Sequence, residues 1–187
     1  MIEDAVILAG GKSRRMGEDK ALLPFKKYKS MSEFQYKKLE KIFTNVYICA
    51  KEEKFDFNAK VIKDIYPIHS PLAGLISIFE TLDCNEVFIL SVDVPFVDGV
   101  IIDTLINQAQ KSSKYDVIVA SSPRGREPLC GVYRRSILPK AKELFFEDIH
   151  KINHLLNLLN TKEIAFKEQK NFLNLNTPED YKEAQNL

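Results

Sequence analysis

The sequence has few cysteines and no pairing among them. Its 187 residues include only Cys49, Cys84 and Cys130, and no two of these form a CxxC pair. An odd number of widely spaced cysteines indicates neither a zinc site nor a disulfide framework. We therefore expect the chain to work in a reducing compartment, the cytoplasm.

The sequence also lacks an excess of charge of one sign. Lysine and arginine number 27 and aspartate and glutamate 26, so the formal net charge is +1. A balanced chain has no overall electrostatic attraction for nucleic acid or for an anionic membrane surface, and we expect neither as a partner. Any basic binding site must therefore be local.

Long hydrophobic runs and internal repeats are absent as well. No apolar run approaches the length that a membrane-spanning helix needs. The first residues, MIEDAVILAGG, carry acids where a secretory signal needs positive charge, so we expect no signal peptide. A chain of this length fits one domain, and we expect residues 1–187 to form a single one.

Strand-like and helix-like segments alternate along the chain. Residues 5–9, for example, are continuously apolar and stop at glycines, which is typical of a buried strand. The alternation predicts an α/β fold: a single three-layer domain with a mostly parallel sheet and helices on both faces. The expected strands are 5–9, 45–50, 60–64, 86–95, 115–121, 127–133 and 161–167, and the expected helices are 30–43, 71–82, 100–110, 137–146, 149–159 and a last one that begins at Thr177-Pro178.

A glycine-rich and basic segment, LAGGKSRRMGEDKALLPF, follows the first strand at residues 8–25. It does not fit a P-loop, because the first glycine of that motif would fall on Val6, inside the strand. It does not fit GxGxxG either, because Lys12 takes the place of the second glycine. Adjacent glycines still let backbone N–H groups approach a phosphate or a base, and the basic side chains can neutralise phosphate oxygens. We expect phosphate binding here; the alternative is a flexible surface turn with solvated lysines.

Asp93 stands near the end of the expected strand 86–95, at the kind of sheet edge where ligands bind. A carboxylate there suits Mg²⁺, which takes hard oxygen ligands, usually one or two carboxylates together with phosphates and waters. We expect Asp93 to hold this metal. The alternative is an aspartate that caps a turn or the next helix.

Two other polar segments are less specific. His150 and His154 have i,i+4 spacing but no third ligand in the sequence around them, so we interpret them as part of the solvated face of a helix. The basic segment 122–126 either contacts an anionic substrate or is an ordinary surface loop.

The glycine-rich segment closely resembles the signature LAGG-x-S-x-R-M-G-x-D-K of the molybdenum cofactor guanylyltransferases, members of a nucleotidyltransferase superfamily with a Rossmann-like fold. The similarity runs from residue 6 to about residue 182. Three later segments resemble that family's motifs in the same order: PLAGL at 71–75, its second glycine segment; VDVPF at 92–96, its metal segment; and NLNTPED at 174–180, its C-terminal motif.

The resemblance implies a Rossmann-like domain that transfers GMP from GTP to the phosphate of the molybdenum–molybdopterin cofactor. The guanine dinucleotide form of the cofactor and pyrophosphate would be the products, and Mg²⁺ the cofactor of the reaction. The substrates would be GTP and the molybdopterin cofactor. Transient contact with cofactor-synthesis proteins and target molybdoenzymes is expected, from a monomer.

The resemblance also assigns residues. The implied catalytic residues are Arg15, Lys20 and Asp93, with Asp93 as the metal ligand. The implied nucleotide-binding residues are Leu8, Ala9, Gly10, Gly11, Lys20, Asp64 and Asp93. For Asp64 the alternative is a plain turn residue.

Asn174 and Asn176 are the implied acceptor-binding residues, and we expect them to face the cleft opposite the glycine-rich segment. In an extended segment their spacing of two puts both on one face, with Leu173 and Leu175 on the other. Asn176 could instead simply lead into the helix cap at Thr177.

Other functions fit parts of the pattern. Cys49 stands where the family often has an asparagine that helps to hold guanine, and a thiol cannot replace an amide's paired donor and acceptor. Cytidylyl transfer, to molybdopterin or to a sugar or polyol phosphate, is therefore the enzymatic alternative. The other alternative is a non-catalytic nucleotide-binding protein on the same fold. Lys20 and Asp93 argue against it, because a mere binder needs no metal-aligned lysine.

Overall fold

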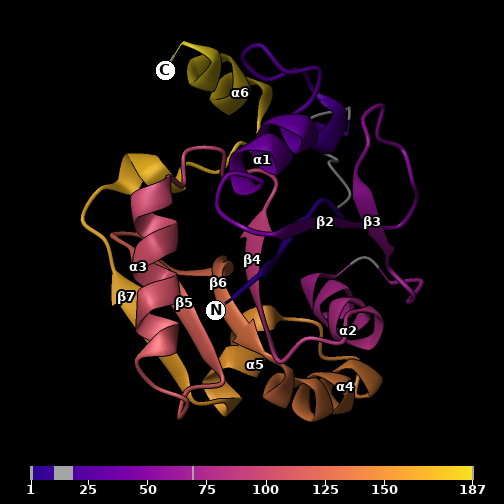
Figure 1. Cartoon of the computed structure of the whole chain (residues 1–187), viewed down its shortest axis with the longest axis vertical. Helices are drawn as coiled ribbons and strands as arrows, with labels where there is room; N and C mark the ends of the chain where they lie inside the picture. The colour runs from indigo at the N-terminus through magenta and orange to yellow at the C-terminus, as the bar shows by residue number, and fades with distance from the viewer. Residues whose placement is uncertain (1, 11–18, 69, 187) are drawn as a thin grey trace.

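The computed structural model describes residues 2–10, 19–68 and 70–186, which form one seven-stranded sheet of order β3-β2-β1-β4-β6-β5-β7 (Figure 1). All seven expected strands form. They are β1 (Asp4–Leu8), β2 (Asn45–Ala50), β3 (Lys60–Lys63), β4 (Glu86–Ser91), β5 (Val117–Ser122), β6 (Gly125–Arg134) and β7 (Thr161–Ala165). The predicted site residues Gly11 and Arg15 lie outside the described residues.

The sheet is mostly parallel, as the alternation of elements predicted. β1 pairs in parallel with β2 and β4, β2 with β3, and β5 with β7. β6 is antiparallel to both of its neighbours, β4 and β5. It follows β5 through a short hairpin turn rather than through a crossover helix, and a hairpin reverses the strand direction.

Helices cover both faces of the sheet, which confirms the three-layer arrangement. α1, α3 and α6 pack on the face that holds Ala5 and Ile7, and α2, α4 and α5 pack on the face that holds Val6 and Leu8 (Figure 1). The helices are α1 (Met31–Leu39), α2 (Pro71–Thr81), α3 (Gly99–Gln110), α4 (Leu138–Phe146), α5 (Ile152–Leu158) and α6 (Pro178–Gln185), with 3₁₀ turns η1 (Lys20–Leu22), η2 (Arg135–Ile137) and η3 (Gln169–Phe172).

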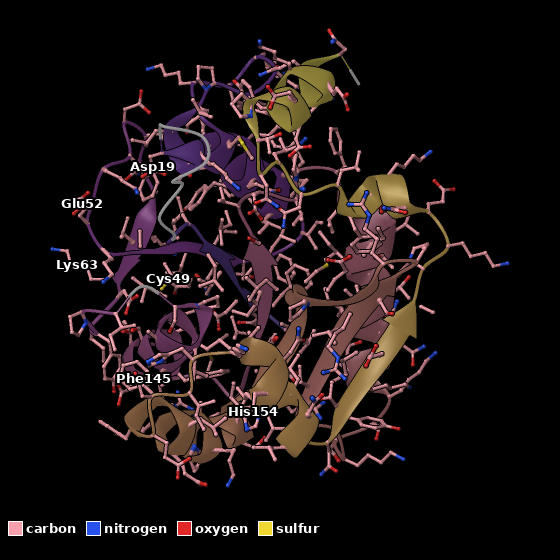
Figure 2. The ribbon with its side chains drawn as sticks, turned by 180° about the vertical axis from the view of Figure 1, so that it is seen from behind. Asp19, Cys49, Glu52, Lys63, Phe145 and His154 are labelled. Carbon is pink, nitrogen blue, oxygen red and sulfur yellow. The ribbon has the colours of Figure 1, made fainter. Side chains whose placement is uncertain are left out.

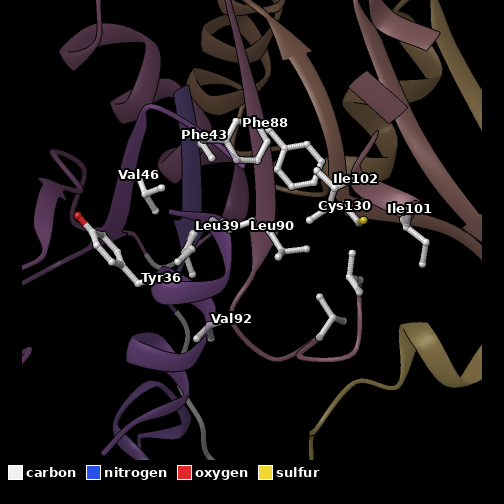
Figure 3. Packing of buried hydrophobic residues seen from close by; sticks show 14 of the residues in the cluster. Tyr36, Leu39, Phe43, Val46, Phe88, Leu90, Val92, Ile101, Ile102 and Cys130 are labelled. Atoms are coloured by element: carbon white, nitrogen blue, oxygen red, sulfur yellow. The ribbon is translucent and has the colours of Figure 1, made fainter. Parts of the chain in front are cut away.

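Aromatic and aliphatic side chains fill the layer between α1 and the sheet (Figure 3). Phe43 and Phe88 stack with their ring centroids 5.3 Å apart and their planes at 20°. Leu39 and Leu90 are fully buried in the same cluster. This packing fixes α1 against β4, the strand that leads to Asp93.

Helix starts follow the sequence closely. Ser70 Oγ accepts from Ala73 N (3.1 Å) at the start of α2, and Pro71 is its first residue. Thr177 and Asp180 form a capping box for α6. Among the described residues no helix is both long enough and apolar enough to cross a membrane.

Several elements are shorter than expected, three of them by the following differences. α1 ends at Leu39 rather than at residue 43, because the chain turns there, with the Ile42 and Phe43 N–H groups both donating to the Leu39 carbonyl. α5 begins at Ile152 rather than at residue 149. β4 ends at Ser91 rather than at residue 95. This last difference matters for function, because residues 92–97 leave the sheet as a loop that carries Asp93; we call this segment the Asp93 loop.

Candidate active site

The carboxyl ends of three neighbouring parallel strands form the floor of the site. Leu8 of β1 is in register with Cys49 of β2 on one side and with Ser91 of β4 on the other. The hydrogen bonding continues past the strand ends, since Ala9 N donates to Cys49 O (3.0 Å) and Val92 N donates to Leu8 O (3.1 Å). Parallel sheets bind their ligands at such an edge.

Lys20 reaches this edge from the end of the glycine-rich segment. Its Nζ donates to Asn176 Oδ1 (2.6 Å) and lies 3.5 Å from Asp93 Oδ2. The side chains of Lys20 and Asp93 are only 12% and 19% exposed. A lysine held in this way presents a fixed positive charge beside a carboxylate, which suits phosphate oxygens and a metal ion.

Asp93 is itself held from two sides. Ser91 Oγ donates to Asp93 Oδ1 (2.6 Å), which fixes the orientation of the carboxylate. The Asp93 carbonyl accepts from Leu175 N (2.9 Å), which ties the Asp93 loop to the C-terminal segment. The site therefore joins β4 to a part of the chain about 80 residues later.

Gln35 of α1 supports the Asp93 loop. Its Nε2 lies 3.3, 3.4 and 3.1 Å from three carbonyl oxygens, those of Ser91, Val92 and Val94. The Gln35 side chain is fully buried, and its Oε1 has no hydrogen-bond partner among the described residues. A buried amide that donates only to one loop fixes the backbone of that loop.

Lys38, one helical turn later, holds the far end of the same loop. Its Nζ donates to the carbonyls of Pro95 (3.0 Å) and Val97 (2.8 Å). Burial lowers the pKa of Lys38 to about 7. Gln35 and Lys38 were not predicted from the sequence, because polar residues on an amphipathic helix usually form its solvated face.

The C-terminal segment brings Asn174 and Asn176 to the site. Both asparagines are exposed and Leu175 between them is buried, as their alternation predicted, while Leu173 is only half-buried. The expectation that both lie opposite the glycine-rich segment is wrong for Asn176. The bond from Leu175 N to Asp93 O draws the segment alongside Lys20, so Asn176 contacts that lysine directly.

Two cavities open along this edge of the sheet. The first is a small cavity of about 30 Å³ whose lining includes Leu8, Gly10, Asp64 and Gly74. The second is wider, about 140 Å³, and its lining includes Asp93, Glu127 and Asn174. Both cavities share Ser91 and Leu129, so they adjoin on either side of the end of β4.

Asp64 follows β3 and takes part in a turn as well as in the first cavity. Its Oδ1 accepts from Tyr66 N (3.2 Å) and lies 3.0 Å from Ser77 Oγ. The contact with Ser77 ties the carboxylate to α2, whose Gly74 lines the cavity together with Asp64. A carboxylate in this position can accept hydrogen bonds from the N–H groups of a base.

Cys49 lines the first cavity and is 2% exposed. Burial raises the pKa of its thiol to about 12, so the sulfur is neutral at physiological pH. A Cβ on Gly74 would lie 2.9 Å from Leu8 Cδ2, so a larger residue there would require the Leu8 side chain to shift. Figure 2 shows Cys49 and Asp19 on the same side of the molecule.

The donor set fits a magnesium ion bound mainly by its nucleotide. Among the described residues there is no group of three or more histidines, cysteines or carboxylates that could hold a metal unaided. Mg²⁺ usually takes one or two protein carboxylates and completes its shell with phosphates and waters. Asp93, oriented by Ser91 and lining the second cavity, provides such a carboxylate.

Asp19 has a structural role that was not predicted from the sequence. Its Oδ1 accepts from Ala21 N (3.0 Å) and caps η1, and its Oδ2 forms an ion pair with Lys54. Together these contacts hold the residue next to Lys20. An aspartate directly before a short helical turn is a common cap, and that signal was present in the sequence.

Arg126 and the two histidines lie apart from this centre, whereas Ser122 and Arg124 of the basic segment interact with Glu127 of the second cavity. Arg126 of the basic segment 122–126 is bonded to Glu163 (2.6 Å) and Asn157 (2.8 Å), away from the two cavities. His150 precedes α5 and is half-buried, with its Nε2 2.8 Å from Asp148 Oδ1, so the prediction of a solvated helix face is wrong for it, because the helix begins only at Ile152. His154 is exposed on α5. Figure 2 shows His154 well away from Asp19, and His154 is part of a solvated helix face, as predicted.

Comparison with known proteins gives a consistent result. Residues 5–163 match the MobA-like NTP transferase domain. A molybdenum cofactor guanylyltransferase from Campylobacter jejuni is 38% identical, over 95% of this chain and 93% of that protein. One from Helicobacter pylori is 32% identical, over 96% of this chain and 86% of that protein.

A solved structure has the same fold. The molybdopterin-guanine dinucleotide biosynthesis protein A from Archaeoglobus fulgidus superposes with a TM-score of 0.81 at 24% identity, over 98% of this chain and 97% of that one. The Rossmann-like architecture is thereby confirmed. By the domain match and the identity over nearly its whole length, the chain belongs to the molybdenum cofactor guanylyltransferase family, within the MobA-like NTP transferases.

Proposed function

We propose that this protein transfers GMP from GTP to the phosphate of the molybdenum–molybdopterin cofactor and releases pyrophosphate. The observation that carries the proposal is the meeting of Lys20, Asp93 and Asn176 between two adjoining cavities. Two cavities with a cationic and metal-binding junction suit a reaction that joins two phosphate-bearing substrates. Membership of the guanylyltransferase family names those substrates.

In this reaction a phosphate oxygen of the acceptor forms a bond to the α-phosphorus of GTP. The bond from that phosphorus to the bridging oxygen of the β-phosphate breaks, and pyrophosphate leaves with the electron pair. Both reactants are anions and the leaving group is stable, so the protein needs no covalent nucleophile. It must align the two phosphates and neutralise their charge.

Lys20 would supply the fixed positive charge at this junction. Its contacts with Asn176 and Asp93 hold Nζ at the junction before any substrate binds. A charge that is already in place costs no reorganisation when negative charge develops on the phosphates. We propose Arg15, in the same segment, as a second phosphate ligand.

We propose Mg²⁺ as the metal and Asp93 as its protein ligand. The ion would neutralise the phosphates of GTP and hold them in line for displacement. Ser91 keeps the Asp93 carboxylate in one orientation, and Gln35 and Lys38 keep the Asp93 loop in place. These residues position Asp93 and do not themselves need to contact a substrate.

We propose that the first cavity holds the base and the second the acceptor. Leu8, Ala9, Gly10 and Gly11 would line the nucleotide along the end of β1. Asp64 would accept hydrogen bonds from the N–H groups of guanine, which cytosine does not present in the same pattern. Asn174 lines the second cavity and would contact the acceptor, while Asn176 would act at the junction with Lys20.

A nucleotide panel tests this proposal. The protein is incubated with molybdopterin cofactor, Mg²⁺ and each of GTP, CTP, ATP and UTP in turn, and the released pyrophosphate is measured. We expect release with GTP well above the other three. Preference for CTP would replace guanylyl by cytidylyl transfer, which the neutral Cys49 in the base cavity leaves open. Binding of a nucleotide without any release would indicate a non-catalytic binding protein.

A further inference from the structure

The second cavity contains a carboxylate that no part of the transfer chemistry uses. Glu127 of β6 lines it together with Asp93 and Asn174. Glu127 is half-buried, and burial raises the pKa of its carboxyl, an effect that Ser122 and Arg124 partly offset. A second carboxylate in a cavity that already holds Asp93 adds negative charge to it. The cavity therefore favours a ligand group that presents hydrogen-bond donors.

An irregularity in β6 brings Glu127 to this place. Val119 of β5 pairs with Gly131, but its neighbour Ala120 pairs with Glu127, so residues 128–130 have no partners on β5. Such a bulge changes the direction in which side chains of a strand point, and bulges are frequent beside active sites.

Two further contacts maintain this irregular shape. A Cβ on Gly131 would lie 2.3 Å from Ile118 O, so only glycine permits the close approach of β6 to β5 at that point. The Tyr133 hydroxyl, from a fully buried side chain, donates to the Pro128 carbonyl beside Glu127. The bulge is therefore a fixed part of the sheet.

The other walls of the cavity are mostly apolar. Phe172 and Cys130 are 3% and 2% exposed, and Pro128, Leu129 and Val94 complete the lining. A mostly apolar pocket with a few polar groups is the usual form of a small-molecule site. Asp93 of the lining lies beside Lys20, and Glu127 is the other carboxylate of the lining.

We propose that Glu127 is a specificity residue that accepts hydrogen bonds from the 2-amino-4-oxopyrimidine edge of the acceptor's pterin ring. That edge carries two adjacent N–H donors, which a carboxylate can accept as a pair. The phosphate of the same molecule then lies toward Lys20 and the nucleotide. This inference rests on the proposed function, because the function supplies a pterin-bearing acceptor.

Two small probes test the inference without turnover. Pterin has the 2-amino group, and lumazine has an oxygen in its place. The affinity of the protein for each is measured by fluorescence titration. We expect the wild type to bind pterin at least ~10-fold more tightly than lumazine, because lumazine keeps the ring N–H but places an oxygen, not a donor, opposite the second carboxylate oxygen. In Glu127→Gln the ratio should fall to near one.

Glu163→Gln is the matched control. It removes one negative charge from β7, where Glu163 is bonded to Arg126 outside the cavity. The ratio of the affinities for pterin and lumazine should stay at its wild-type value. Affinities for GTP and ITP, which differ in the same amino group, are measured in parallel. They should be unchanged in Glu127→Gln, which would also show that the variant is folded. If Glu127→Gln is unstable, Glu127→Asp replaces it and should lower the ratio by withdrawing the carboxylate.

Three results would overturn the inference: equal wild-type affinities for pterin and lumazine, an unchanged ratio in both Glu127 variants, or a loss of GTP-over-ITP discrimination in them. The last result would make the second cavity the guanine site. Failure of the proposed function would give a different result. The wild type would then release no pyrophosphate from GTP, whatever the ratio of its affinities for pterin and lumazine.

Discussion

Lys20 Nζ lies 2.6 Å from Asn176 Oδ1, which joins the end of the glycine-rich segment to a residue 156 positions later. The same nitrogen is 3.5 Å from Asp93 Oδ2. One cation thus contacts the first, middle and last parts of the chain at a single point. The site is complete only when the C-terminal segment is docked on the Asp93 loop.

Replacement of Lys20 tests its part in phosphate neutralisation. We predict that Lys20→Ala lowers kcat/KM for GTP at least ~100-fold, the usual effect of removing one electrostatic stabiliser. The free energy of unfolding, measured by urea titration, should change by less than ~1 kcal/mol, because the charges of Lys20 and Asp93 are a long 3.5 Å apart and both side chains keep some contact with solvent. A variant that unfolds readily while its folded fraction works normally would make Lys20 a structural residue.

Replacement of Asp93 tests the metal assignment. Asp93→Asn is nearly isosteric and can keep the hydrogen bond with Ser91, so the fold should persist. We predict at least ~100-fold lower turnover and a weaker dependence of rate on Mg²⁺ concentration. Asp98→Asn is a suitable control, since Asp98 caps α3 through Ile101 N (3.0 Å) and asparagine is an equally good cap. Full activity of Asp93→Asn, or of wild type in excess chelator, would contradict the assignment.

Replacement of Gln35 tests whether catalysis requires the Asp93 loop to be fixed in place. Gln35→Met keeps the volume but removes the donor that faces three loop carbonyls. We predict a loss of about 1–3 kcal/mol in the free energy of unfolding and a lower kcat, with the KM for GTP less affected. Lys37→Met, on the exposed side of α1, should change neither quantity. If Gln35→Met is destabilised but has a normal kcat, Gln35 stabilises the fold and does not position Asp93 for catalysis.

Lys38 gives a prediction for the dependence of stability on pH. Its pKa is about 7 in the folded protein, below the ordinary value of 10.5. Between these values the unfolded chain binds the extra proton, so the free energy of unfolding should rise as pH rises, by at most ~1.4 kcal/mol per pH unit from this group. Denaturant titrations from pH 7 to pH 9 should show a smaller rise in Lys38→Met than in wild type. Equal slopes would mean that Lys38 keeps its proton in the fold.

The sequence predicted the elements of this fold better than their arrangement. The uninterrupted apolar run of β1 and the capping pattern of Thr177 to Asp180 identify their elements by local chemistry alone. The direction of β6 did not follow from its residues, because a strand has the same alternation in either orientation. Its bulge, and with it the place of Glu127, depends on a close approach to β5 at Gly131 that no local pattern indicates.

The site also combines residues that a local motif identifies with contacts that depend on long-range packing. Lys20, Asp93 and the asparagines were identified by motif, and the structure brings Lys20, Asp93 and Asn176 together. The contact of Asn176 with Lys20 was not foreseen, because it depends on how the last segment packs across the sheet. Gln35 and Lys38 were not predicted because their partners are backbone carbonyls. Every residue has such a carbonyl, so the sequence does not indicate which ones accept hydrogen bonds from a side chain.

The fate of the phosphates of GTP tests the central claim most directly. GTP labelled separately at the α- and γ-phosphates is incubated with the protein, Mg²⁺ and molybdopterin cofactor, and the products are separated. We predict that the α-label appears in the cofactor and the γ-label in pyrophosphate, and that both transfers are lost in Asp93→Asn. Appearance of the γ-label in the cofactor, or transfer of the α-label from CTP in preference to GTP, would contradict guanylyl transfer by this site.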